Sequence, residues 1–421
     1  MAERILVVGG GIAGLVAARQ LVLGGADVTV IEATDRLGGQ IARHTVGGID
    51  LDAGADSFAT HRDTVPALAR RLGLEDALVS PNPAPAWLYR ADGSAVALPA
   101  TAVAGIPGVP MAADVVAAIG RRAAVRAQLD SVLLGQVGAR ALTLGELVER
   151  RMGRGVLDGL VAPVMRGVHS RDPAEIEIDS AVPGLRAAFL REGTLASAVR
   201  RVRAAAPGGS PVQGLRGGVS RLVDALASDL DRFGVGVITG SRVVGADPRG
   251  VVLEGGARIA GAPLIAAPGV TGEAGAGRRV TLVTLVVDAP ELGATPRGTG
   301  VLVAEGAPVR ARSLAHLSAT WDWVAEAAGG REVLRLSYDG EPDGDPVATA
   351  VAEASVLLGL PIGRPEATAI VTWERAAPRT HSVDGMHHLG ESVSGTGIAA
   401  VVAQAGAVAT ELTADDTEPP G

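Results

Sequence analysis

The hydrophobic pattern at the start of the chain changes its period twice, which predicts a strand, a helix and a second strand. Ile5 to Val8 is a short continuous apolar run, typical of a strand that is buried in a parallel sheet. Apolar residues then recur at helical spacing from Leu15 to Val22 and stop at Gly24-Gly25. A second apolar run, Val28 to Ile31, completes the pattern of a parallel strand–helix–strand unit.

The rest of the chain alternates between helical and strand-like patterns. Helices are predicted at 62–72, 112–148, 180–206, 215–233, 347–358 and 396–412. Strands are predicted at 49–51, 235–238, 242–244, 250–253, 264–267, 281–287, 300–304, 312–318 and 332–338, with a hairpin at 87–98. The final residues, 413–421, are expected to be disordered.

The junction between the first strand and the first helix carries a glycine motif that fits the phosphates of a dinucleotide. Gly9 permits the tight turn, Gly11 lets the backbone approach a pyrophosphate, and Gly14 lets the helix pack against the strand. The helix N-terminus then offers free N–H groups to the phosphates. Glu32 ends the second strand about 20 residues further on, where a carboxylate can accept hydrogen bonds from ribose hydroxyls. The alternative is a glycine-rich turn in an ordinary α/β protein.

The residues after Glu32 discriminate between FAD and NAD. Asp35-Arg36-Leu37-Gly38-Gly39 follows directly, and this pattern resembles the second signature of FAD oxidoreductases built like amine oxidases, phytoene desaturases and porphyrinogen oxidases. Arg36 can pair with pyrophosphate oxygens, and the two glycines let the backbone come close. We therefore predict FAD; the alternative is a surface turn with a solvated arginine.

A second glycine-led helix start lies near the other end of the chain. Gly390 to Ala399 is predicted to hold a strand end, a loop and the first turn of a helix. The N–H groups and dipole of that helix could face the flavin or its pyrophosphate. The alternative is a C-terminal packing helix with an ordinary threonine cap.

Three further stretches resemble the oxygen-dependent porphyrinogen oxidases, the family of protoporphyrinogen oxidase and its coproporphyrinogen-oxidising relatives. They are Gly54-Ala55-Asp56-Ser57-Phe58, Gly167-Val168-His169-Ser170-Arg171-Asp172-Pro173 and Leu215-Arg216-Gly217-Gly218. The resemblance covers nearly the whole chain. The family's Y-A-G is His169-Ser170-Arg171 here, the segment between Pro378 and His388 is short, and Glu391 is unusual in the closing motif.

The resemblance implies an α/β (α+β) fold in which a Rossmann-type FAD domain is interleaved with a β-sheet substrate domain and a helical subdomain. The FAD domain would comprise 1–75, 205–270 and 375–412, the sheet domain 76–110 and 271–374, and the helical subdomain 111–204. The implied FAD contacts are Gly9, Gly11, Ile12, Ala13, Gly14, Glu32, Ala33, Arg36, Gly38, Gly39, Gly54, Ala55, Asp56, Val243, Gly390, Glu391, Thr396, Gly397 and Ile398.

The resemblance also implies a reaction: a porphyrinogen, with coproporphyrinogen III preferred, loses hydride to flavin N5 in haem biosynthesis. Oxygen then reoxidises the flavin and hydrogen peroxide leaves. Because pyrrole protons can pass to water or to backbone carbonyls, no strong base is required, and the carbonyl of Gly167 is one candidate acceptor. Propionates need cations, for which the candidates are Arg43, Arg62, Arg90, Arg166 and Arg171. For each of these, the alternative is a solvated surface arginine.

Composition narrows the remaining classes. The chain has 421 residues, a formal net charge of -8, no cysteine and no lysine. No basic patch suggests nucleic acid, and the histidine spacing does not suggest a metal site. With no predicted leader or membrane span we expect a cytoplasmic protein with at most peripheral membrane contact; the sequence is compatible with a homodimer.

Three other functions stay open. A flavin amine or amino-acid oxidase generally uses a lysine-held water and an aromatic cage, which a chain with no lysine and two tyrosines supplies poorly. A carotenoid-desaturase-like enzyme is a second alternative. The third is a catalytically impaired flavin-binding homologue.

Overall fold

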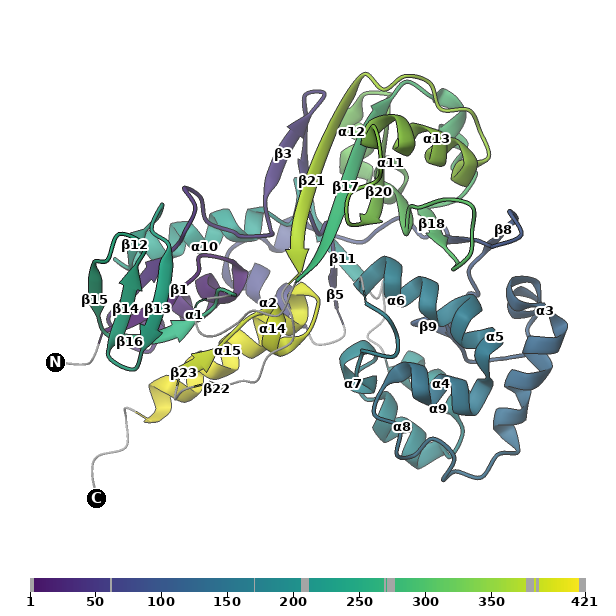
Figure 1. Cartoon of the computed structure of the whole chain (residues 1–421), viewed down its shortest axis with the longest axis horizontal. Helices are drawn as coiled ribbons and strands as arrows, with labels where there is room; N and C mark the ends of the chain where they lie inside the picture. Colours follow the sequence, from purple (N-terminus) through teal and green to yellow (C-terminus); the bar gives the residue numbers. More distant parts are fainter. Residues whose placement is uncertain are drawn as a thin grey trace. The chain divides into compact units, whose positions relative to one another are not determined.

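The computed structural model describes residues 4–60, 63–169, 171–205, 212–268, 270, 277–375, 382–383 and 386–415. The chain forms two compact units, and Figure 1 traces it from purple to yellow. Unit 1 comprises Met1–Ser80, Gly209–Arg279 and Trp373–Gly421, and unit 2 comprises Pro81–Gly208 and Val280–Thr372. The predicted helical block and second sheet thus share one unit; their division into a helical subdomain and a substrate domain stays a prediction.

Among the described residues, unit 1 is built on a six-stranded sheet in the order β12-β2-β1-β16-β23-β22. Its strands are β1 (Ile5–Val8), β2 (Val28–Ile31), β12 (Gly236–Ile238), β16 (Ala262–Ile265), β22 (Ser382–Val383) and β23 (Met386–His388). Neighbours from β12 through β23 pair in parallel, whereas β22 is antiparallel to β23. This topology confirms the predicted Rossmann-type arrangement.

The two faces of this sheet are covered by different elements. Val7 and Val30 lie in the core formed with helices α1 (Ile12–Leu23), α10 (Arg221–Arg232) and α15 (Ile398–Asp415). Leu6, Val8 and Ile31 lie in a second cluster with the antiparallel strands β13 (Val243–Asp247), β14 (Gly250–Leu253) and β15 (Arg258–Ala260). Alternate side chains of a strand point to opposite faces, which explains why adjacent residues of β1 belong to different clusters.

Shorter elements complete unit 1. They are β3 (Arg43–Val46), β4 (Ile49–Asp52), β5 (Phe58–Ala59), α2 (Thr64–Arg71), η1 (Glu75–Ala77), β6 (Leu78–Val79), β11 (Val212–Leu215) and α14 (Glu391–Ser394). β3 and β4 form an antiparallel hairpin, and β11 pairs with both β5 and β6.

As far as the structure describes unit 2, it contains a seven-stranded sheet in the order β21-β17-β20-β19-β18-β7-β8. The strands are β7 (Trp87–Tyr89), β8 (Ala95–Ala97), β17 (Arg278–Val287), β18 (Gly300–Val303), β19 (Ser313–His316), β20 (Glu332–Asp339) and β21 (Ala367–Arg375). Beside it lie η4 (Pro290–Ala294), α11 (Leu317–Thr320), α12 (Asp322–Ala328) and α13 (Pro346–Leu358).

The helical part of unit 2 has its own apolar core, which includes Leu144, Val148 and Phe189. Its elements are β9 (Ala102–Val103), β10 (Ile106–Pro107), α3 (Ala113–Gln128), η2 (Leu129–Ser131), α4 (Leu144–Met152), α5 (Arg154–Val156), η3 (Leu157–Val161), α6 (Ala162–His169), α7 (Ile178–Ala181), α8 (Leu185–Glu192) and α9 (Leu195–Ala205).

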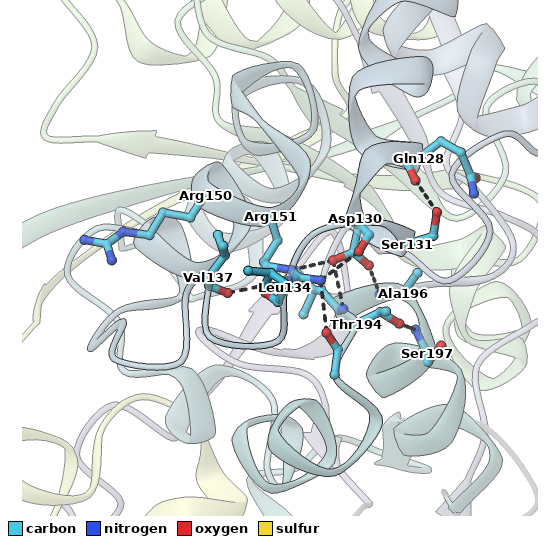
Figure 2. A network of polar contacts seen from close by, with 12 residues as sticks. Gln128, Asp130, Ser131, Leu134, Val137, Arg150, Arg151, Thr194, Ala196 and Ser197 are labelled. Carbon is cyan, nitrogen blue, oxygen red and sulfur yellow. Dashed lines mark hydrogen bonds and ion pairs between the residues drawn. The ribbon is translucent and has the colours of Figure 1, made fainter.

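A buried ion pair organises this helical part (Figure 2). Arg151 in α4 and Asp130 in η2 have side chains that are 0% and 1% exposed, and Arg151 Nε donates to Asp130 Oδ1 at 2.6 Å. Arg151 also donates to the carbonyl oxygens of Leu134 and Gly193. Asp130 in turn accepts hydrogen bonds from two N–H groups at the start of α9. The pair therefore ties a loop, two helices and a turn together.

Several predicted element boundaries were wrong. The helical stretch expected over 112–148 is interrupted: α3 is kinked at Gly120, which adopts φ 81°, and ends at Gln128, and α4 begins at Leu144. Arg151 holds carbonyls of the loop between them. The strand expected over 312–318 ends at His316, and the helix expected from 215 begins at Arg221. The strands β21 and β11 were not predicted.

The expectation of a disordered tail beginning at Thr413 was also wrong, because α15 continues to Asp415. A Cβ added to Gly24 would lie 2.5 Å from Thr413 Cγ2, so the last turn of α15 packs against the end of α1. The rest of the predicted tail, 416–421, and the predicted break at 207–211 lie outside the described residues.

Candidate functional site

The turn between β1 and α1 has the shape that the glycine motif predicts. Gly9 adopts φ 110°, and a Cβ added to Gly14 would lie 1.9 Å from the carbonyl oxygen of Gly9, so both positions need glycine. By contrast, a Cβ added to Gly11 would have no described atom within 4 Å. No side chain of the described chain caps the start of α1 at Gly11. The turn therefore exposes backbone N–H groups on an open face, as an anion requires.

Glu32, the predicted partner of the ribose, supports this turn through hydrogen bonds of its carboxylate. Its Oε2 accepts a hydrogen bond from the N–H of Gly10 at 2.7 Å. Its Oε1 accepts from the N–H and the hydroxyl of Thr34, both at 2.8 Å. A carboxylate has about four acceptor positions, so further hydrogen bonds are available to a ribose. The contacts to Gly10 and Thr34 were not predicted from the sequence.

The second signature lies directly against the first. The N–H of Gly38 donates to the carbonyl of Gly10 at 2.8 Å, and a Cβ on Gly39 would lie 3.3 Å from Gly11 Cα. Arg36 is exposed, and its guanidinium donates to the carbonyl oxygens of Leu37 and Gly39. The two signatures thus form one backbone surface, and a role of Arg36 toward phosphate stays a prediction.

The closing turn reaches the same helix start from the far end of the chain. The N–H of Leu389 donates to the carbonyl of Ile265 at 2.8 Å, which continues the β16–β23 pairing. A Cβ on Gly390 would lie 3.6 Å from Ala13 Cβ, at the beginning of α1. The predicted residues Thr396 and Gly397 immediately precede α15, which begins at Ile398. The structure therefore brings both glycine-led turns together.

The remaining predicted FAD residues lie on neighbouring segments of unit 1. Ala33 follows β2, and Val243 begins β13 in the cluster that contains Ile31. Gly54 follows β4, where an added Cβ would lie 2.7 Å from the carbonyl oxygen of Gln40. Ala55 is exposed and Asp56 is half-buried. Their roles as cofactor contacts stay predictions.

Asp52 is a residue that the sequence analysis missed. It is buried at the end of β4, and its carboxylate accepts hydrogen bonds from the N–H groups of Val219 and Ser220, at 2.8 and 3.0 Å. A Cβ on Gly218 would lie 2.8 Å from Asp52 Oδ1, and Gly218 adopts φ 96°. The Leu215–Gly218 motif therefore leaves room for a carboxylate just before α10. The sequence feature that could have identified Asp52 is an acidic residue at the end of a strand, just before the Gly54 turn.

The four described candidates for propionate binding are divided between the two units. In unit 1, Arg43 lies on β3 with Nη2 at 3.9 Å from Asp224 Oδ2, and Arg62 lies outside the described residues. In unit 2, Arg90 donates to Ser94 and to the carbonyl of Ala117. Arg171 is half-buried.

Arg166 and Gly167 have structural partners in unit 2. Arg166 donates to Asp172 and to Glu305, each at 2.7 Å. Burial lowers the pKa of Arg166, but these hydrogen bonds raise it overall, so the guanidinium stays charged. A Cβ on Gly167 would lie 2.5 Å from Leu302 Cδ2, which shows how closely α6 packs on β18. A substrate role for either residue stays a prediction.

No group of three or more histidine, aspartate or glutamate side chains in the described ranges is placed to hold a metal ion. Within the same ranges, no helix combines the length and apolar character needed to cross a bilayer.

The described unit 1 fits FAD on its own geometry. An open glycine face, an uncapped helix start, an acid at the end of β2 and a second glycine turn from the C-terminal part converge at one place. These groups suit a diphosphate, a ribose and a flavin in turn.

Comparison with known proteins agrees with this geometry. The family described as flavin containing amine oxidoreductase matches residues 12–259. The coproporphyrinogen III oxidase of Mycobacterium tuberculosis is 33% identical over 369 residues, covering 82% of this chain and 78% of that protein. The Bacillus subtilis protein of the same name is 24% identical over 427 residues, covering 90% and 88%.

A solved structure shares the fold along the whole length. This crystal structure, from an Exiguobacterium species and provisionally named a protoporphyrinogen oxidase, superposes with a TM-score of 0.83 at 21% identity and covers 99% of each chain. The chain is thus an FAD-dependent oxidoreductase, and it belongs to the flavin containing amine oxidoreductases, in the group of the coproporphyrinogen III and protoporphyrinogen oxidases.

Proposed function

We propose that this protein oxidises coproporphyrinogen III to coproporphyrin III in haem biosynthesis. The observation that carries the proposal is the 33% identity to the Mycobacterium tuberculosis coproporphyrinogen III oxidase across 82% of the chain. The absence of lysine supports it against an amine oxidase, because no lysine can hold the water which that class generally places at the flavin.

Unit 1 supplies the cofactor's environment. The N–H groups behind Gly11 and Gly39 would hold the pyrophosphate, Glu32 would accept hydrogen bonds from the ribose, and the turn from Gly390 to Ile398 would close the site. Bound FAD supplies a two-electron acceptor, taking hydride at N5 and passing electrons to oxygen with release of hydrogen peroxide. The protein's part is to orient this group and set its electrostatic surroundings.

The substrate needs cations to pair with its propionates and an acceptor for its pyrrole protons. Of the described candidates, Arg43 and Arg171 are the more available, because Arg90 and Arg166 already donate to partners within unit 2. Arg62, outside the described residues, stays a candidate. The carbonyl of Gly167 is proposed to accept a pyrrole proton. Coproporphyrinogen carries four carboxylates and protoporphyrinogen two, so loss of a propionate-binding arginine should raise KM for the former more.

We also propose that the protein acts in the cytoplasm, that unit 1 is the FAD domain, and that the sheet of unit 2 binds the substrate. A homodimer is a further part of this proposal, which the mass of the FAD-loaded protein in solution tests directly.

The test is a parallel assay of the FAD-loaded protein in air. Porphyrin fluorescence should appear from coproporphyrinogen III faster than from protoporphyrinogen IX, with hydrogen peroxide released in step. The matched control is a primary amine. Peroxide from the amine without porphyrin fluorescence would show that the protein is an amine oxidase instead. A flavin-loaded protein that turns over neither porphyrinogen nor the amine would be an impaired homologue.

A further inference from the structure

Four side chains of unit 1 join segments that are far apart in the sequence. Gln40 follows the second signature, Trp373 and Arg375 lie at the end of β21, and Glu391 begins α14. Figure 1 shows the end of β21 close to α14. None of these contacts was predicted, although Glu391 is among the residues that the resemblance implies for FAD binding.

The contacts form a continuous chain. Arg375 Nη1 donates to Glu391 Oε1 at 2.7 Å, and Gln40 Nε2 lies 3.4 Å from Glu391 Oε2 and 3.3 Å from the carbonyl oxygen of Glu374. Trp373 Nε1 donates to the carbonyl of Ala53 at 3.2 Å. Through these bonds the end of β21 contacts the segment before Gly54, the segment after Gly39 and the segment after Gly390.

Each of the three segments that β21 reaches carries a glycine predicted to contact FAD. The Arg375–Glu391 ion pair therefore lies at the cofactor site and fastens the closing turn to the rest of it. The two side chains are 29% and 16% exposed, so solvent screens their charges only in part. A charge beside a flavin also matters electrostatically, because charge near the flavin N1 region tunes its electronics.

We propose that Arg375 and Glu391 are a positioning pair that holds the closing turn on FAD and balances charge beside the flavin. Without Arg375, the carboxylate of Glu391 is uncompensated and disfavours the additional electrons of the reduced flavin. Without Glu391, the guanidinium is uncompensated and favours them. The inference rests on the FAD site and not on the proposed substrate, so its test needs no porphyrinogen.

The test compares R375Q, E391Q and the double variant R375Q/E391Q by FAD titration and by flavin reduction potential. Each single variant should bind FAD about tenfold more weakly, as expected for loss of a charged hydrogen bond. The potential should fall in R375Q and rise in E391Q, and it should return close to the wild-type value in the double variant. A purely structural role would not produce shifts of opposite sign.

The matched control is the exposed pair Arg258–Asp247 in unit 1, which has the same N–O distance of 2.7 Å. R258Q should leave both FAD affinity and potential unchanged. If a single variant fails to fold, the swapped variant R375E/E391R keeps the ion pair and should bind FAD like the wild type. Potentials that stay unchanged or shift in the same direction in both single variants, or a swapped variant that binds FAD no better than the single variants, would overturn the proposal.

Discussion

Two glycines of the first turn differ in the space that surrounds them. A Cβ on Gly14 would overlap the carbonyl oxygen of Gly9, whereas a Cβ on Gly11 would enter space that no described atom occupies. Gly14 is therefore required by the fold, whereas the proposed role of Gly11 is to let FAD approach the backbone. Substitution of Gly14 should therefore affect stability, and substitution of Gly11 should affect cofactor binding.

Substituting these glycines with alanine should produce two different defects. G14A should lose about 3 kcal/mol or more of unfolding free energy, because the clash is with backbone and cannot be relieved by a rotamer change. G11A should change the stability of the FAD-free protein by less than about 1 kcal/mol, and it should weaken FAD binding. Urea unfolding of the FAD-free protein and FAD titration measure the two effects. Equal stability losses in both variants would contradict the assignment.

Glu332 provides a pH-dependent contribution to stability in unit 2. Burial raises the pKa of this carboxyl, but hydrogen bonds with His316 and Ser318 outweigh burial and lower the pKa overall. A carboxylate with a lowered folded-state pKa stabilises the protein above the unfolded-state value of about 4.3. That contribution is lost as the pH falls through the lower, folded-state pKa.

We therefore expect E332Q to be less stable than the wild type at neutral pH and to lose less stability on acidification below about pH 4.3. Urea unfolding across this range measures, for both proteins, the slope of the unfolding free energy against pH. The control is D288N, which removes an exposed carboxylate instead of the half-buried one that His316 and Ser318 hold. An E332Q slope as steep as that of the wild type would assign the acid sensitivity to other groups.

At the scale of elements, a single arginine shapes the helical part of unit 2. Arg151 donates to the carbonyls of Leu134, Val137 and Gly193 and pairs with Asp130, which holds the first N–H groups of α9 (Figure 2). The backbone hydrogen bonds recorded within the loop between η2 and α4 are short-range turns, such as that from the N–H of Val137 to the carbonyl of Leu134. The course of this loop therefore depends on the Arg151 side chain.

Removing one partner of the pair should be costly. R151M should lower the free energy of unfolding by about 3–5 kcal/mol, because Asp130 would be left buried without its cation. The control is R154Q, which should leave the free energy of unfolding nearly unchanged, because Arg154 pairs with Glu149 at 2.8 Å but is 80% exposed and solvent screens the pair. Urea unfolding measures both. A small effect of R151M would show that water or a shift of the loop compensates.

The elements of the two units differ in how far the local sequence determines them. The β1–α1–β2 unit follows from local period and glycine spacing, because neighbours in sequence determine it. The course of the chain after α3 does not follow from the local sequence. It depends on Arg151, which lies more than twenty residues away in the chain from its partner Asp130. The alternation of β21 from Ala367 to Arg375 was readable, but its charged and exposed positions weaken the signal.

At the scale of the whole molecule, parallel pairing explains how one site is built from distant segments. β1, β16 and β23 are parallel neighbours, so the turns that follow β1 and β23 emerge at the same edge of the sheet. Gly9 and Gly390 therefore lie in one site of unit 1. The glycine motifs predicted this from the sequence, whereas the contacts of Asp52, Gln40 and Arg375 depend on tertiary packing and were not predictable locally.

The most direct test of the proposed function is to mix the FAD-loaded protein with coproporphyrinogen III without oxygen. The visible absorption of the oxidised flavin should disappear as porphyrin fluorescence rises, and admitting air should restore the absorption and release hydrogen peroxide. G11A, loaded at the same FAD concentration, should show both changes only in proportion to the flavin it retains. A flavin that stays oxidised in the presence of coproporphyrinogen III would contradict the proposed function.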